Sequence, residues 1–124
     1  MKRIIRTDKA PAAIGPYSQA VEINNTLYIS GQLPINAETQ EMPDKISDQA
    51  EVVMKNIGII LEEAGYNYQQ VIKSTIFLAD INDFQEMNEI YGKYYKENPP
   101  ARSAFQVANL PKGAKIEIET IAAK

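Results

Sequence analysis

The 124-residue sequence contains no cysteine and no histidine, and these two absences remove whole classes of chemistry. Without cysteine there is no disulfide framework and no thiolate nucleophile. Ser-His-Asp triads, Cys-His dyads and the usual zinc sites are excluded by composition as well. An all-oxygen Mg²⁺ or Ca²⁺ site would still be compatible with the composition, but the chain has no Asp-rich loop of the EF-hand kind. We therefore expect no metal.

Basic charge and long apolar runs are also scarce. The 13 basic residues are outnumbered by 16 acidic ones, which argues against nucleic acid as the main partner because phosphate neutralisation needs a basic surface. No apolar run reaches the roughly 18 residues of a membrane span, and the N-terminus lacks a signal peptide's hydrophobic stretch. With 44% apolar and 23% charged residues, we expect one globular domain over residues 1–124, located in the cytoplasm.

Turn residues and β-branched residues predict strands in the first third of the chain. Residues 1–7 suit a short edge strand, whose basic side chains block aggregation. Residues 19–23 and 26–30 flank Asn24-Asn25, and this pair suits a two-residue hairpin turn because asparagine tolerates positive φ. Gly31 would let a ligand approach its backbone N–H closely. A bulge or a strand-terminating bend is the alternative, and spacing alone favours this alternative.

Helical periodicity appears twice in the remainder of the chain. An apolar stripe predicts a helix over residues 46–64, capped by Asp44 or Ser47 and ended by Gly65. Residues 71–78 read as a strand, with odd-numbered side chains on one face and even-numbered ones on the other. A second helix begins at the signal Asp83-Phe-Gln-Glu86, carries an aromatic stripe and stops at Asn98-Pro99-Pro100.

The last two strands are predicted over residues 103–109 and 114–122. In the final strand, Ile116 and Ile118 face one side while Glu117 and Glu119 face the other. The order β-β-β-α-β-α-β-β predicts an α+β fold with a mixed sheet of about six strands and both helices on one face. Because semi-polar side chains would cover the opposite face, we expect a subunit contact there and hence a homo-oligomer.

Few side chains are candidates for chemistry. Arg102 follows a stiff diproline and suits a small carboxylate, although a surface salt bridge is the alternative. Glu117 could orient or deprotonate water, or be an ordinary exposed strand residue. Tyr17 could donate its hydroxyl to a ligand, although such rings usually pack. Asn88, on the aromatic helix, is by default a satisfied polar group. Residue types alone favour a small-anion site only slightly.

Several motifs together identify a resemblance to a known family. Residues 10–19 (APAAIGPYSQ), 29–34 (ISGQLP), 100–103 (PARS), 110–112 (LPK) and 116–119 (IEIE) closely resemble the reactive-intermediate deaminase family, the RidA/YjgF group, in order and at the family's spacing. The resemblance implies a chorismate-mutase-like α+β fold with the last strand in the middle of the sheet. It also implies a homotrimer with ligand clefts between subunits.

The same resemblance implies an activity and a set of residues. The family hydrolyses 2-enamino and 2-imino acids, such as 2-aminoacrylate and 2-iminobutanoate, to 2-keto acids and ammonia without a cofactor. By matching motif positions, Arg102 would hold the substrate carboxylate and Glu117 would hold the water. Gly31 would offer its backbone N–H, and the cleft would be lined by Tyr17, Ser30 and Asn88.

Two departures and two alternatives complete the expectation. Ala104 stands where many members have cysteine, which excludes thiol modification there, and Gln40 stands in a loop that often has glycine, which could alter access to the cleft. The main alternative is a non-catalytic trimeric sensor or binder of small 2-keto or 2-imino acids. RNA cleavage, claimed for some relatives, is disfavoured by the acidic balance and the missing histidines.

Overall fold

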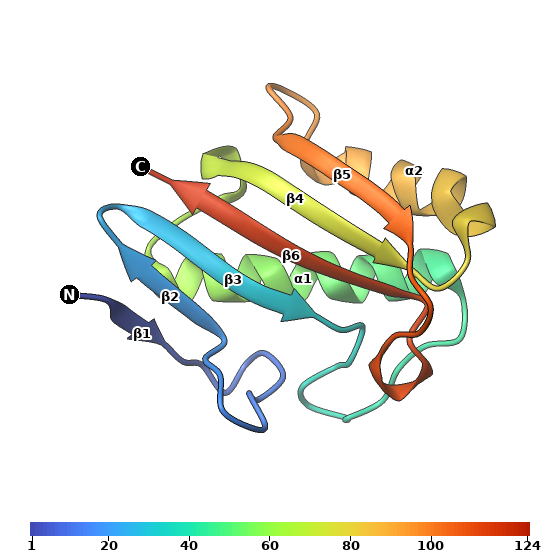
Figure 1. Ribbon diagram of the computed structural model, residues 1–124, viewed down its shortest axis with the longest axis horizontal. Helices are drawn as coiled ribbons and strands as arrows, with labels where there is room; N and C mark the ends of the chain where they lie inside the picture. The colour runs from blue at the N-terminus through green and yellow to red at the C-terminus, as the bar shows by residue number, and fades with distance from the viewer.

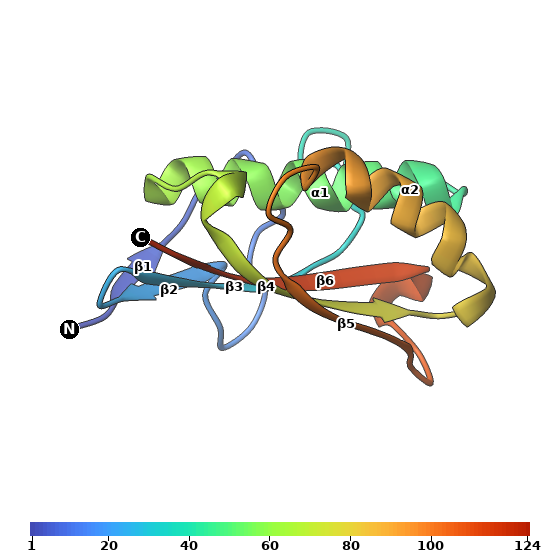
Figure 2. The ribbon, with the colours of Figure 1, turned by 90° about the horizontal axis from the view of Figure 1, so that it is seen from above.

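The computed structural model describes residues 1–124 as one mixed sheet with two helices on one face (Figures 1 and 2). The strands are β1 Arg3–Ile5, β2 Ala20–Ile23, β3 Thr26–Gln32, β4 Val71–Leu78, β5 Ala101–Gln106 and β6 Ile116–Ala123. The helices are α1 Ile46–Ala64 and α2 Phe84–Tyr94, and single 3₁₀ turns lie at Tyr68–Gln70, Ile81–Asp83 and Pro111–Gly113. The predicted α+β class and element order are confirmed.

The last strand lies in the middle of the sheet. The strand order is β1-β2-β3-β6-β4-β5, so β6 pairs antiparallel with both β3 and β4 (Figure 1). Strands β4 and β5 are parallel and are connected through α2. The edges of the sheet are β1 and β5. This topology confirms the central last strand that the family resemblance implied.

Local sequence signals account for the hairpin and for an irregularity beside it. Asn24 and Asn25 turn the β2–β3 hairpin with φ of 50° and 59°. Further along β3, Ile29 pairs with Thr120, but the next residue in register is Gln32, opposite Ile118. Two residues of β3, Ser30 and Gly31, therefore oppose a single residue of β6, as in a β-bulge. Of the bulge and the strand-terminating bend left open at Gly31, the structure has the bulge.

The core lies between the helices and one face of the sheet. The apolar stripe of α1 is buried along its whole length, and Gly65 ends the helix with φ of 83°. Across from it, Ile116 and Ile118 of β6 are essentially inaccessible. Each such side chain contributes roughly 1.5–3 kcal/mol by leaving water. Glu117 and Glu119 alternate onto the opposite face, as the period of a strand requires.

The helix starts differ from the predictions. Helix α1 begins after Lys45, which makes no side-chain cap, so neither Asp44 nor Ser47 has the predicted role. Before α2, Asp80 accepts a hydrogen bond from the Asn82 N–H and caps a 3₁₀ turn that runs directly into the helix. Asp83 is therefore already in helical conformation and its side chain caps nothing.

The remaining element boundaries also differ from the predictions. Helix α2 ends at Tyr94, before the diproline that was expected to stop it, and β5 begins at Ala101 rather than at residue 103. In β4, a register shift between Val71 and Lys73 buries Val71 and leaves Ile72 exposed. The strict odd–even alternation predicted for residues 71–78 is wrong at that bulge and holds beyond it.

The face of the sheet away from the helices is uncovered in the protomer. Figure 2 shows both helices on one side of the strands and none on the other. Tyr28 and Phe105 are 48% and 44% exposed there, and Phe105 packs edge-on against Phe77 with ring centroids 5.5 Å apart. Neither helix combines the length and hydrophobicity needed to cross a bilayer.

Candidate functional site

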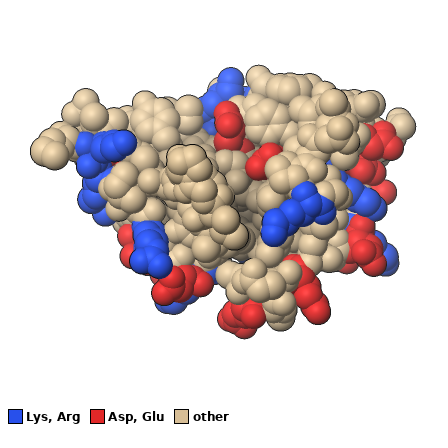
Figure 3. All heavy atoms as spheres, turned by 60° about the horizontal axis from the view of Figure 1, so that its bottom comes forward, with Lys and Arg blue, Asp and Glu red and all other residues tan.

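A cavity of about 730 Å³ lies where three loops meet the carboxyl end of β3 and the start of β6. Its lining includes Tyr17, Ser30, Gly31 and Glu117. These loops are at the bottom of Figure 1, and Figure 3 turns that side forward, where acidic atoms are surrounded by uncharged ones. The structure therefore brings four of the six predicted site residues to one cavity.

The surroundings of Glu117 in this cavity make it a candidate reactive group. Its carboxylate is half-buried and makes no hydrogen bond or ion pair within the protomer. Burial raises the pKa of Glu117 above its ordinary value, and the charge of Glu119 raises it further. An unpaired carboxylate with a raised pKa in a cavity is the environment expected of a group that exchanges protons.

Gly31 leaves room for that carboxylate. A Cβ atom added to Gly31 would lie 2.6 Å from Oε2 of Glu117 and 2.9 Å from its Cδ, closer than such atoms approach in real structures. The bulge at Ser30 and Gly31 thus brings the backbone of β3 directly against the Glu117 side chain. The bulge and the close approach predicted as alternatives at Gly31 are compatible, because a bulge allows the backbone to approach a neighbouring group closely.

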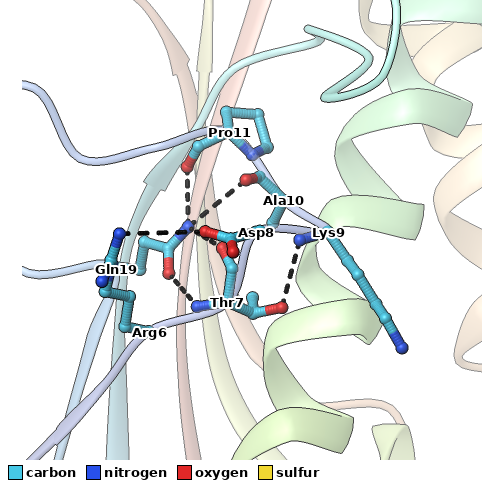
Figure 4. Close-up of polar contacts among 7 residues, drawn as sticks. All are labelled: Arg6, Thr7, Asp8, Lys9, Ala10, Pro11 and Gln19. Atoms are coloured by element: carbon cyan, nitrogen blue, oxygen red, sulfur yellow. Dashed lines mark hydrogen bonds and ion pairs between the residues drawn. The ribbon is translucent and has the colours of Figure 1, made fainter.

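Gln19 holds the loop that carries Tyr17 (Figure 4). Its buried amide nitrogen donates to the carbonyl oxygens of Thr7 at 3.0 Å and Pro11 at 2.8 Å, and its oxygen accepts from the Thr7 N–H at 2.7 Å. These bonds join Gln19, the residue before β2, to the segment at residues 7–11, which leads into the cavity wall. Tyr17 itself is 56% exposed, so its hydroxyl is available to a ligand.

Ser30 has a local role within the protomer. Its hydroxyl donates to the Ser18 carbonyl oxygen at 2.6 Å, and its backbone N–H donates to the Gln19 carbonyl oxygen at 2.9 Å. The Ser30 hydroxyl oxygen retains acceptor capacity toward the cavity. It therefore suits a ligand N–H better than a ligand carbonyl.

Arg102 and Asn88 lie together, but outside this cavity. Nη1 of Arg102 donates to Oδ1 of Asn88 at 2.6 Å, and the guanidinium lies over the rings of Phe84 and Tyr91. Arg102 forms no ion pair, so the alternative of a surface salt bridge is wrong for this protomer. Asn88 is exposed and accepts this hydrogen bond, so its default interpretation as a satisfied polar group is confirmed.

One protomer does not bring Arg102 and Glu117 together. Arg102 is in register with Ser74, which faces the helices, whereas Glu117 is in register with Phe77 on the uncovered face. The two side chains thus leave the sheet on opposite faces, from strands separated by β4. An arginine beside a glutamate, as the sequence suggested, requires residues from two copies of the chain.

Sequence reasoning gave no role to two residues that shape the cavity, Gln19 and Lys112, and it named Gln40 only as a departure that could alter access. Gln19 was present in a quoted motif, but nothing in a single sequence marks a buried amide as a loop anchor. Lys112 and Gln40 also line the cavity, and both are in left-handed conformation with φ of 59° and 62°. The Pro111-Lys112-Gly113 turn was a sequence signal for Lys112. Gln40 is held by a bond from its Nε2 to the Ala37 carbonyl oxygen at 2.7 Å, which offsets the missing glycine.

No cluster of carboxylates is arranged to hold a metal ion. The site instead offers the unpaired carboxylates of Glu117 and Glu119, hydroxyl groups and backbone groups in the cavity, with the Arg102 guanidinium elsewhere on the surface. Such groups can orient a small polar molecule, fix its negative end and move a proton.

Comparison with known proteins identifies the family. The model of the family described as Endoribonuclease L-PSP matches residues 7–124. The chain belongs to this family. It is the RidA/YjgF group that the motifs resembled, so that expectation is confirmed.

Relatives within the RidA/YjgF family are similar over nearly the whole chain. Human 2-iminobutanoate/2-iminopropanoate deaminase is 51% identical over 123 residues, covering 98% of this chain and 90% of the human protein. A crystal structure from Thermotoga maritima, described as an endoribonuclease, has a TM-score of 0.97 and 47% identity, covering 100% of this chain and 98% of that one. Escherichia coli TdcF with bound serine has a TM-score of 0.95 and 42% identity, covering 98% of both chains.

Proposed function

We propose that the protein is a cofactor-independent deaminase that hydrolyses 2-imino and 2-enamino acids to 2-keto acids and ammonia, acting in the cytoplasm. The observation that carries the proposal is the unpaired Glu117 carboxylate in its cavity, in a chain about half identical to proteins named as 2-iminobutanoate/2-iminopropanoate deaminases. The serine bound to TdcF is a small amino acid with a carboxylate, which is the same class of ligand.

The reaction requires little of the protein. The C2 atom of a 2-imino acid is already electrophilic, so the site has to hold the carboxylate and present a water. The water oxygen attacks C2 as Glu117 removes a proton, and the C=N electron pair moves to nitrogen, which takes a proton. The carbinolamine then loses ammonia as its hydroxyl becomes the C2 carbonyl. An enamine enters the same sequence after protonation at C3.

In this proposal Arg102 binds the substrate carboxylate through parallel N–H donors. The Gly31 N–H and the Tyr17 hydroxyl contact the substrate, and Ser30 and Asn88 complete the cleft. Glu117 acts as the base, and a raised pKa suits it because a base works best when its pKa is nearer the working pH.

The proposed site lies between subunits of a homotrimer. Opposite faces of the sheet separate Arg102 from Glu117, so one copy would supply the cavity and its neighbour the arginine with Asn88. The uncovered sheet face with its exposed Tyr28 and Phe105 offers an apolar surface for the contact. A ring of identical subunits uses heterologous contacts, which join two different patches as this site requires.

The activity is tested by ammonia release from freshly generated 2-iminobutanoate. We expect faster release with the protein and loss of the gain in Arg102→Ala. Lys93→Ala is the matched control, because it also removes a cation, in this case from α2. The ammonium of Lys93 lies 4.0 Å from the Glu51 carboxylate. Equal rates with and without protein would reject the enzyme. Calorimetric binding of 2-ketobutyrate without turnover would then select the sensor.

Mixing two inactive variants tests the shared site. Arg102→Ala and Glu117→Gln are each expected to be inactive as pure oligomers. After subunit exchange at equal amounts, about one quarter of the sites would combine an intact glutamate from one copy with an intact arginine from the next. Recovery of about a quarter of the wild-type rate supports the shared site, and no recovery in mixed oligomers contradicts it. Light scattering measures whether the oligomer is a trimer.

A further inference from the structure

Arg102 is held by a stripe of side chains on α2 rather than by an acid. Phe84, Asn88 and Tyr91 recur at intervals of four and three residues, so they lie on one face of the helix. The guanidinium carbon is 5.3 Å from the centroid of the Phe84 ring and 5.1 Å from that of Tyr91. These two residues are about two helical turns apart, roughly 10 Å along the axis. The guanidinium thus lies between the two rings, above Asn88.

We infer that Phe84 and Tyr91, the aromatic cradle, are positioning residues that orient the Arg102 guanidinium for a substrate carboxylate. This inference rests on the proposed function, because it assigns these rings a role in that site. An unrestrained arginine loses much side-chain freedom when it binds a ligand. Rings that hold the guanidinium beforehand reduce this loss, and cation–π attraction is the force that holds it.

The cradle leaves the arginine available for binding. A guanidinium has five N–H donors, and only one hydrogen bond, to Asn88, is present in the protomer. The rings attract its charge and take no donor. An acidic partner would also have oriented Arg102, but it would have neutralised the charge and occupied the paired donors that a carboxylate needs. Aromatic rings are therefore the support that preserves anion binding.

The Tyr91 hydroxyl is not part of this function. It is buried without a hydrogen-bond partner, as are the hydroxyls of Tyr95 and Ser74. Burial raises the pKa of Tyr91, with smaller opposing effects from the Ser74 hydroxyl and the Arg102 charge, so the side chain stays neutral near pH 7. The ring face toward Arg102 then acts alone, and Tyr91→Phe should keep the function that Tyr91→Leu loses.

The test compares Phe84→Leu and Tyr91→Leu with wild type in the 2-iminobutanoate assay and in calorimetric 2-ketobutyrate binding. Each leucine variant is expected to raise KM and the Kd for 2-ketobutyrate about two- to five-fold, with kcat within two-fold of wild type. Tyr91→Phe should restore wild-type values. Tyr94→Leu is the structural control, because Tyr94 lies on the same helix and bonds Glu51 rather than Arg102.

Four results would overturn the inference. The first is an unchanged KM and Kd in both folded leucine variants, and the second is a loss in Tyr91→Phe equal to that in Tyr91→Leu. The third is the same rise in KM in Tyr94→Leu. The fourth is an effect of Phe84→Leu on the Kd for 2-ketobutyrate that is undiminished in an Arg102→Ala background. The binding arm separates the two proposals. If wild type binds 2-ketobutyrate without turnover, the deaminase fails, while weaker binding by the leucine variants still supports the cradle.

Discussion

Replacing Gly31 with alanine tests whether the position of Glu117 determines the rate. The added Cβ would lie 2.6 Å from Oε2 of Glu117, and ordinary carbon–oxygen contact begins near 3.4 Å. The carboxylate must therefore move by roughly 1 Å. Gly31 does not have a positive φ, so alanine adds no backbone strain, and the flexible end of Glu117 can yield. We expect a folded protein with a misplaced base.

The size of the loss follows from that displacement. A misplacement of about 1 Å costs on the order of 10²-fold in rate for a positioned catalytic group. The backbone N–H at position 31 is kept by alanine, so substrate binding should change much less than turnover. In the 2-iminobutanoate assay, kcat is therefore expected to fall about 100-fold with little change in the Kd for 2-ketobutyrate.

A double-variant cycle identifies the cause of the loss. If Gly31→Ala acts through Glu117, it should have little further effect once Glu117→Gln has removed the base, because the two changes disable the same group. Equal fold losses in both backgrounds would show that the glycine acts independently, and an unchanged kcat in Gly31→Ala would refute the reasoning outright. A thermal melt of each variant checks that the fold is kept.

Three further predictions concern stability, each measured by thermal or urea unfolding. The folded state raises the pKa of Glu117, so the contribution of this group to stability is full below the unfolded pKa of about 4.3 and is lost as pH rises through the folded pKa. Glu117→Gln should therefore have a higher melting temperature than wild type at pH 7, and this difference should vanish below about pH 4. Gln19→Ala should lose about 1–3 kcal/mol, because it leaves the buried Thr7 N–H and loop carbonyls unpaired, and an unchanged midpoint would contradict that role. Gly58→Ala should lower the free energy of unfolding by about 1–3 kcal/mol, because its Cβ would overlap the side chain of Tyr68, which packs on two other tyrosines. Gly92→Ala has open space around its Cβ and should raise the free energy of unfolding by about 0.5–1 kcal/mol. Equal effects of the two substitutions would contradict the packing argument.

Periodicity and turn chemistry were sufficient to predict the fold class. The Asn24-Asn25 turn, the α1 stripe and the alternation around Glu117 each follow from contacts within a short segment, and all three are present. Errors occurred where a nonlocal feature decides. The bulge at Val71 depends on how β4 pairs with β6, and the start of α2 depends on Asp80, which lies upstream of the apparent capping signal.

The candidate residues were predictable, but their arrangement was not. Alternation placed Glu117 on the face opposite Ile116 and Ile118, and this is confirmed. The face of Arg102 depends on its register with Ser74, and no local pattern reports the pairing of a parallel edge strand. Tyr91 lies in the core and Phe84 packs against it, and both rings also contact the arginine. Only the joined positions of β5 and α2 reveal that contact.

The location of the two groups in the sheet explains why the proposed site needs a neighbour. Glu117 lies on the central strand, so loops must build walls around it, and they leave its cavity open on the uncovered side of the sheet. Arg102 lies on the edge strand β5, which is exposed on both faces apart from the half-buried Ala104. An edge strand can approach another copy of the chain without any rearrangement of the core. A ligand held by both groups must therefore lie where the edge of one copy meets the open cavity of the next.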